Sequence, residues 1–222
     1  MAQIKVIDVN VDVTHHLHAL RVAGVESIFA YLNPLGSNEK AITPPRARAI
    51  RDAGLRLGLV SEGWGDFAHH GISSSAGKRD ALHAVRTAPL LGLNGEATIY
   101  FAVDTDATWG QIISLVIPYF KAIHEHIGGL RVGCYGSGAV CETLLQQQLV
   151  THAWLAQSRG WLRSREFALT DKWALRQLMP SHIAGVSCDP NEGRGEIGDF
   201  VPFGAPVVPD TPVASADVPR AT

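Results

Sequence analysis

Two carboxylates follow the most apolar stretch of the chain. Residues 98–103, Thr-Ile-Tyr-Phe-Ala-Val, have no polar face, which is typical of a strand buried on both sides in a parallel sheet. Asp104 and Asp106 come directly after it. Strand residues two apart point the same way, so the pattern predicts two carboxyl groups on one face, with Cα atoms roughly 6 to 7 Å apart. Such a pair is suited to acid and base chemistry. A second interpretation is that Asp106 caps a helix beginning near Ala107.

Three more acids follow apolar runs elsewhere in the chain. Asp8, Glu62 and Asp189 each come at or just after the end of such a run. The predicted strands are residues 3–9, 27–32, 55–60, 98–103, 130–135, 152–156, 172–178 and 186–189, with helices predicted between most of them, for example over 44–53, 78–91, 109–127 and 139–149. Pro118 is expected to kink or divide the helix predicted over residues 109–127.

Repeated strand and helix units predict a parallel sheet with helices outside it. About eight strands in about 200 residues fit a closed (β/α)8 TIM-like barrel, with an open doubly wound sheet as the alternative. The barrel explains the acids better, because it would gather the carboxyl ends of four different strands around a single mouth. We therefore expect one α/β domain over residues 1–200.

Composition excludes several classes of protein. The 222 residues carry a formal net charge of -2 without a basic cluster, so nucleic acid is not expected as a partner. The first residues contain neither a signal peptide nor a membrane span, so we expect synthesis in the cytoplasm, with any action outside the cell only after export by a non-classical route. Cys134, Cys141 and Cys188 are interpreted as small buried residues in a reducing compartment.

Five motifs, in this order along the chain, resemble those of a known family. They are Tyr-Phe-Ala-Val-Asp-Thr-Asp at 100–106, Val-Gly-Cys-Tyr-Gly-Ser-Gly at 132–138, Ala-Trp-Leu-Ala at 153–156, Trp-Ala-Leu-Arg-Gln at 173–177 and Cys-Asp-Pro-Asn at 188–191. Over roughly residues 4–200 the chain resembles the bacterial glycoside-hydrolase-like domains of unknown function, which are relatives of the glycoside hydrolase family 25 lysozymes. The resemblance implies a distorted (β/α) barrel and peptidoglycan or a related polysaccharide as substrate.

The resemblance also implies roles for four acids. Asp8 matches the first-strand acid of the lysozymes, and Asp189 matches an acid at their final strand. Asp104 matches the first residue of their Asp-x-Glu pair, and Asp106 stands where that pair has the Glu proposed as proton donor. Asp is one methylene shorter than Glu, and a misplacement of about 1 Å can cost on the order of 100-fold in rate. Glu62 has the longer reach, so the identity of the acid stays open between Asp106 and Glu62.

Glycoside hydrolysis would require two carboxyl groups in different environments. One must be protonated at working pH, which burial and nearby like charge achieve by raising its pKa. The other must be ionised, and it could attack the anomeric carbon, activate water, or orient the N-acetyl group of the substrate. The resemblance favours the substrate-assisted route with Asp104 as the orienting carboxylate.

Several side chains near predicted strand ends are candidates for sugar binding, with core packing as the alternative for each aromatic ring. They are Tyr31, Trp64, Tyr135, Trp154 and Gln177, together with the acid Asp189. Tyr135 is favoured most, because the Gly-Ser-Gly turn after it lets backbone approach closely. The glycine spacing around Tyr135 does not match a dinucleotide-binding fingerprint, and no cofactor is expected.

The 10 histidines predict no metal site. His124 and His126 would diverge on a helix, and His-Glu-x-x-His is absent from the sequence. The adjacent pair His69 and His70 is the exception to check, because it lies in a long loop that would overhang the mouth.

The last 22 residues differ in composition from the rest. Residues 201–222 are proline-rich and nearly free of helix or strand pattern, so we expect an extended tail.

Three functions fit the sequence. The first is a lysozyme-like muramidase. The second is a carbohydrate-binding barrel without turnover, and the third is a module delivered by a phage or secretion apparatus. The enzyme would depend on an export partner such as a holin or an injection machine.

Overall fold

The chain folds as a closed α/β barrel. The computed structural model describes residues 4–32, 40–62, 72–93 and 97–202. Its strands are β1 (Ile4–Asp8), β2 (Ser27–Tyr31), β3 (Arg56–Ser61), β4 (Thr98–Ala102), β5 (Arg131–Gly136), β6 (His152–Leu155), β7 (Leu175–Gln177), β8 (Ser181–Ile183) and β9 (Val186–Gly193). β1 to β7 pair in parallel in chain order, and β9 closes the ring between β7 and β1. The predicted barrel is therefore confirmed.

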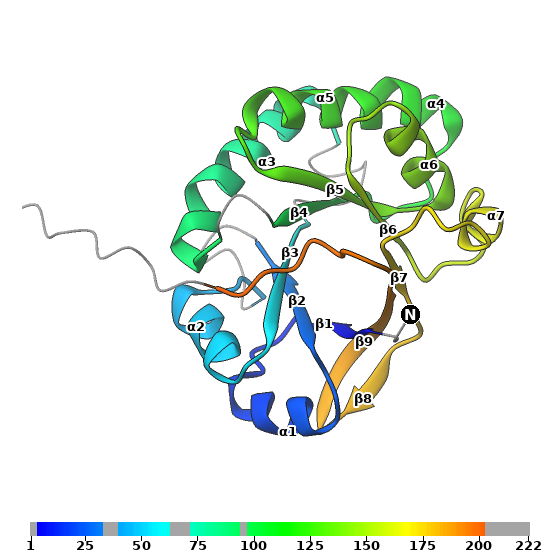
Figure 1. Ribbon diagram of the computed structural model, residues 1–222. Coiled ribbons are helices and arrows are strands. Elements are labelled where there is room, and N and C mark those ends of the chain that lie inside the picture. The colour runs from blue at the N-terminus through cyan, green and yellow to red at the C-terminus, as the bar shows by residue number, and fades with distance from the viewer. Residues whose placement is uncertain (1–3, 33–39, 63–71, 94–96, 203–222) are drawn as a thin grey trace, which may run out of the picture.

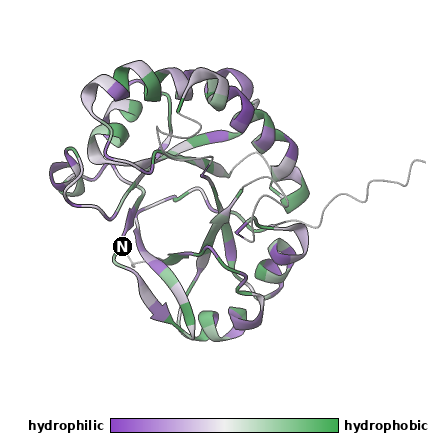
Figure 2. Cartoon of the chain, turned by 180° about the vertical axis from the view of Figure 1, so that it is seen from behind, coloured by the Kyte–Doolittle hydropathy of each residue, from purple (hydrophilic) through white to green (hydrophobic). Residues whose placement is uncertain are grey.

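Helices surround the barrel on most of its circumference (Figure 1). They are η1 (Thr14–His16), α1 (Leu17–Val22), α2 (Pro44–Asp52), α3 (Ser74–Thr87), η2 (Ala88–Leu91), α4 (Trp109–Gln111), η3 (Ile112–Val116), α5 (Ile117–His126), α6 (Gly138–Gln146) and α7 (Ser164–Ala168). Hydrophilic and hydrophobic residues both occur along these helices (Figure 2), as expected for a layer with one face on the barrel. Among the described residues, no helix combines the length and apolar character needed to cross a membrane.

The last part of the barrel differs from the prediction. β9 is eight residues long and runs antiparallel to both of its neighbours in the barrel, and β8 pairs with its first residues as a hairpin. The expectation of an eighth parallel strand ending at Asp189 was wrong. Neither β8 nor α7 was predicted, because each is too short to show a hydrophobic period.

Pro118 divides its helix as predicted. The segment from Trp109 begins as α4, continues as the π-helical turn η3 and becomes α5 at Ile117. Pro118 is at the start of α5, where its missing N–H group is tolerated.

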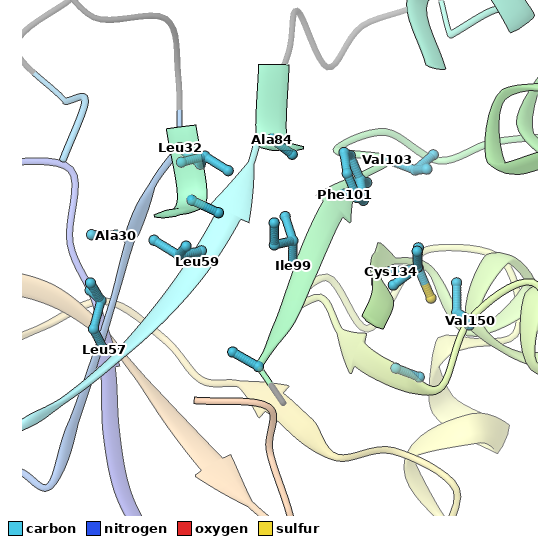
Figure 3. Packing of buried hydrophobic residues seen from close by; sticks show 14 of the residues in the cluster. Ala30, Leu32, Leu57, Leu59, Ala84, Ile99, Phe101, Val103, Cys134 and Val150 are labelled. Atoms are coloured by element: carbon cyan, nitrogen blue, oxygen red, sulfur yellow. The ribbon is translucent and has the colours of Figure 1, made fainter. Parts of the chain in front are cut away.

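The apolar core has two layers. Outward-facing strand residues pack against the helices, as shown for Leu59, Ile99 and Phe101 near Ala84 of α3 (Figure 3). Inside the barrel, Phe29, Tyr100 and Trp154 contact one another edge to face, with ring centroids 5.2 to 5.8 Å apart. The barrel interior is therefore filled by side chains below its mouth.

Gly58 makes room for this aromatic cluster. A Cβ atom at position 58 would lie 2.3 Å from Cε1 of Phe29. We expect Gly58→Ala to lower the free energy of unfolding by about 1 to 3 kcal/mol, because an overpacked core displaces its side chains. Urea unfolding measures the change. Gly129→Ala is the control, because its Cβ would meet nothing within 4 Å. Equal effects of the two variants would contradict this account of the core.

The chain after β9 closes the end of the barrel opposite the mouth. Its path crosses the barrel between β7 and β3 (Figure 1). The carbonyl of Ile197 accepts a hydrogen bond from the Tyr100 hydroxyl at 2.8 Å, and Phe200 pairs with Leu57 of β3. Access to the barrel interior is thus left to the end where the parallel strands finish.

Candidate active site

A pocket of about 160 Å³ occupies the carboxyl ends of the parallel strands. It is lined by Asp8, Tyr31, Val60, Glu62, Ala102, Asp104, Tyr135, Trp154, Gln157, Gln177 and Asp189. Most of these continue the inward-facing alternation of their strands: Val6 then Asp8, Phe29 then Tyr31, Leu175 then Gln177. Three of the four residues proposed as catalytic, and five of the six proposed for binding, therefore line one pocket.

Asp189 reaches this pocket from a strand that runs the other way. In β9 it is the fourth residue, and its register partner in β1 is Asp8, the last residue of that strand. The start of an antiparallel strand lies beside the ends of the parallel ones, so Asp189 still arrives at the mouth.

Asp8 is the most deeply placed acid of the pocket. It is 4% exposed and accepts a hydrogen bond from Asn191 Nδ2 at 2.8 Å. Gln177 Nε2 lies 3.2 and 3.3 Å from its two carboxyl oxygens. Burial is the largest influence, and together with the charges of Asp189 and Glu62 it raises the pKa of Asp8 to about 7 despite these two donors.

The orientation of the two amides around Asp8 follows from their other partners. Trp154 Nε1 can only donate, and it donates to Asn191 Oδ1 at 2.7 Å, so the amide nitrogen of Asn191 faces Asp8. The amide nitrogen of Gln177 also faces Asp8, and its Oε1 accepts a hydrogen bond from the Tyr135 hydroxyl at 2.8 Å. These two rings contact each other edge to face with centroids 5.2 Å apart. Trp154 and Tyr135 thus fix the side-chain amides of Asn191 and Gln177, which donate hydrogen bonds to Asp8.

Glu62 and Asp104 form the outer part of the acidic group. Glu62 is half-buried, and burial followed by the charge of Asp104 raises its pKa. Asp104 is exposed at the mouth, and partial desolvation of its carboxyl by the pocket walls still raises its pKa. The charge of Lys40 opposes both shifts. Its Nζ lies 5.4 Å from the centroid of the Tyr31 ring.

Removal of Lys40 tests this electrostatic assignment. We expect Lys40→Met to raise the pKa of both Glu62 and Asp104, because a nearby positive charge favours the ionised carboxyl. Carbon-13 NMR titration of the side-chain carboxyl groups measures the change. Lys172→Met is the matched control, since Lys172 lines a separate cavity together with His152, the first residue of β6. A downward shift, or the same shift in both variants, would contradict the assignment.

Asp106 is not brought into the pocket. β4 ends at Ala102, and the chain then makes two tight turns, in which Thr105 N–H donates to Val103 O and Ala107 N–H donates to Thr105 O. These turns break the strand alternation, so the expectation that Asp104 and Asp106 share a face was wrong. Asp106 Oδ1 instead accepts a hydrogen bond from the backbone N–H of Leu162 at 2.7 Å. The cap of the following helix is Thr108, not Asp106.

The sequence did not single out Asn191, Gln157 or Lys40 for this site. Asn191 carries a signal that could have been used, because it lies two residues after Asp189 and shares its face in a strand. Gln157 and Lys40 lie outside the strands and carry none. Trp64, His69 and His70 fall outside the described residues. Within the described ranges no group of three or more His, Cys, Asp or Glu is placed to hold a metal ion.

A closed barrel with carboxyl groups from four strands at one mouth defines the class of glycoside-hydrolase-like barrels. The chain belongs to the family of Rv2525c-like, glycoside hydrolase-like domains, whose model matches residues 18–187. Two proteins of Bacillus subtilis, the uncharacterized proteins FadG and YbfG, are each 28% identical to it over 168 and 159 residues. These matches cover 72% and 67% of this chain but only 29% and 21% of the two relatives.

Solved structures show the same fold. The Tat-secreted protein Rv2525c of Mycobacterium tuberculosis, in complex with L-tartrate, superposes with a TM-score of 0.75 at 20% identity, over 89% of this chain and 99% of that one. A family 25 glycosyl hydrolase from Bacillus anthracis gives 0.53 at 14% identity, over 87% and 89%. The modular autolysin LytC from Streptococcus pneumoniae, in complex with a synthetic peptidoglycan ligand, gives 0.56 at 12% identity, over 86% and 47%.

Proposed function

We propose that this protein is a glycoside hydrolase that cleaves the glycan strands of peptidoglycan. The observation that carries the proposal is the convergence of Asp8, Glu62, Asp104 and Asp189 on one pocket that three aromatic side chains also line. Burial raises the pKa of all four acids, that of Asp8 to about 7, and the four carboxyl groups differ in burial and in neighbouring charge, as acid and base roles require. The similar folds of lysozymes, and of an autolysin solved with a peptidoglycan ligand, support the choice of substrate.

Glu62 is the proton donor in this proposal. It lines the pocket and has the longer side chain, and burial followed by the charge of Asp104 raises its pKa, which favours the protonated form. Its proton passes to the glycosidic oxygen as the bond to the anomeric carbon breaks. Asp106 is bound to the Leu162 backbone outside the pocket lining, which favours Glu62 over it.

Asp104 is the ionised partner. It is the more exposed of the two, so its negative charge is better solvated than that of Glu62. From the mouth it would orient the N-acetyl group of an amino sugar, whose carbonyl oxygen then attacks the anomeric carbon from the opposite face. Asp8, held by Asn191 and Gln177, supports the sugar from the floor of the pocket.

Hydrolysis of purified sacculi tests the proposal. We expect the wild-type protein to release reducing ends at some pH between about 4 and 8, with turnover lowered on the order of 100-fold in Asp104→Asn. Asp171→Asn is the control, since Asp171 is exposed and lines the cavity that also contains Lys172. This function requires the protein to reach the cell wall, which fractionation of the producing cells would examine.

A carbohydrate-binding barrel without turnover is the second candidate. The family 25 lysozymes, which the chain resembles, have Glu as the proposed proton donor at the position of Asp106. The carboxyl group of Asp106 accepts a hydrogen bond from the backbone N–H of Leu162. Retained binding to sacculi without reducing ends across that pH range would favour this function and rule out the hydrolase.

A further inference from the structure

Trp109 is a large aromatic side chain presented to solvent. It is 48% exposed and begins α4. The turn that carries it is fixed by a capping box, in which Gln111 N–H donates to Thr108 Oγ1 at 3.3 Å and Thr108 N–H donates to Gln111 Oε1 at 2.9 Å. Ile113, 66% exposed, follows at the i+4 position and extends the apolar surface. An apolar surface held in a fixed turn loses little freedom when it binds a ligand.

Two features of the chain relate the position of Trp109 to the pocket. Asp104 lines the pocket five residues before it, and five residues span at most about 17 Å. Between them, Asp106 accepts the Leu162 N–H and so joins the loop after β4 to the loop after β6. Gln157 in that second loop lines the same pocket. Trp109 begins the helix that follows β4, and in a (β/α) barrel such a helix starts at the end where the parallel strands finish, so Trp109 lies on the mouth side of the barrel.

The size of the pocket leaves most of a polymer outside it. Its volume of about 160 Å³ is smaller than the roughly 300 to 1,000 Å³ of pockets that enclose a drug-sized ligand. A single sugar ring or its acetamido group fits this space, and the neighbouring sugars of a strand must cross the rim. A sugar has an apolar face of C–H groups that packs on the electron-rich face of an aromatic ring.

We propose that Trp109 forms a subsite on the rim that binds a sugar of the glycan strand outside the pocket. The proposal rests on the proposed function in taking the occupant to be a glycan. It makes the preferred substrate a strand of several sugars, because only such a ligand reaches both the pocket and the rim. Asp106 is then a positioning residue for the rim rather than an acid.

Binding of short and long N-acetylglucosamine oligomers tests the subsite. The full-length chain carries Glu62→Gln throughout, so that no ligand is cleaved during the measurement. We expect Trp109→Ala to weaken binding of the hexamer by about 3- to 10-fold and to leave binding of the dimer unchanged, while Trp109→Phe retains most of the affinity. Val22→Ala, at a side chain 76% exposed on α1, is the control for loss of exposed apolar surface.

The outcomes separate this proposal from the proposed function. Equal hexamer affinity in Trp109→Ala and its parent, or no hexamer binding by the parent, would overturn the subsite. A change in oligomeric state in Trp109→Ala, measured by light scattering, would also overturn it, because the surface would then contact a second copy of the chain. If wild-type protein releases no reducing ends from sacculi while hexamer binding depends on Trp109, the subsite stands and the hydrolase does not.

Discussion

Glu62→Gln is expected to abolish most of the hydrolytic activity. Glutamine keeps the length of the side chain and its capacity for hydrogen bonds, but it has no proton to transfer to the leaving oxygen. Loss of a general acid typically costs about 10² to 10⁴ in rate. The measurement is the rate of reducing-end release from purified sacculi, with circular dichroism to show that the variant is folded.

Asp106→Asn is the matched control for this prediction. It makes the same chemical change in the segment after β4, and the asparagine oxygen can still accept the Leu162 N–H. We expect turnover close to that of the wild type. A large loss in Asp106→Asn with little loss in Glu62→Gln would instead identify Asp106 as the acid, and the loop after β4 would then have to rearrange to bring it into the pocket.

The two acids also show what the sequence could and could not predict. Asp104 was expected at the mouth because it directly follows an apolar strand, and it does line the pocket. The prediction for Asp106 was wrong, because it extended the strand alternation past Ala102 into a segment that makes two tight turns. Strand ends are the least certain part of such a prediction, and a shift of one or two residues there reverses which face a side chain occupies.

Asp189 reached the predicted place through two errors that cancel. The sequence was interpreted as a parallel strand ending at Asp189, whereas β9 is antiparallel and Asp189 lies near its start. Either arrangement puts the residue at the same end of the barrel. A hydrophobic period says nothing about strand direction, and the short hairpin of β8 and β9 that reverses the chain had no clear turn signal. The location of the Asp189 carboxyl group at the mouth was therefore predictable, but the direction of its strand was not.

Asp8 is expected to make the folded protein less stable as pH rises from about 4 to about 7. Its pKa is raised from 3.8 in a solvated chain to about 7 in the folded protein. Between these two values the folded state binds more protons than the unfolded state, so the free energy of unfolding falls with increasing pH. The shift of about 3 units corresponds to at most about 4 kcal/mol, lost between about pH 4 and pH 7. Asp80, buried at the contact of α3 with α5, has a raised pKa and adds to the same trend, whereas Asp12 and Glu196 have lowered pKa values and oppose it.

Comparison of variants isolates the contribution of Asp8 from those of the other acids. Urea unfolding of the wild type and of Asp8→Asn at several pH values between about 4.5 and 8.5 should show a shallower decline in the variant, because asparagine does not ionise. The absolute stability of Asp8→Asn is less informative than its slope with pH. The amide introduced at position 8 would face N–H donors of both Asn191 and Gln177, which changes the stability for a reason other than ionisation. If Asp8→Asn declines as steeply as the wild type, Asp8 ionises as readily in the folded protein as in the unfolded chain, and the floor of the pocket then carries a full negative charge at neutral pH.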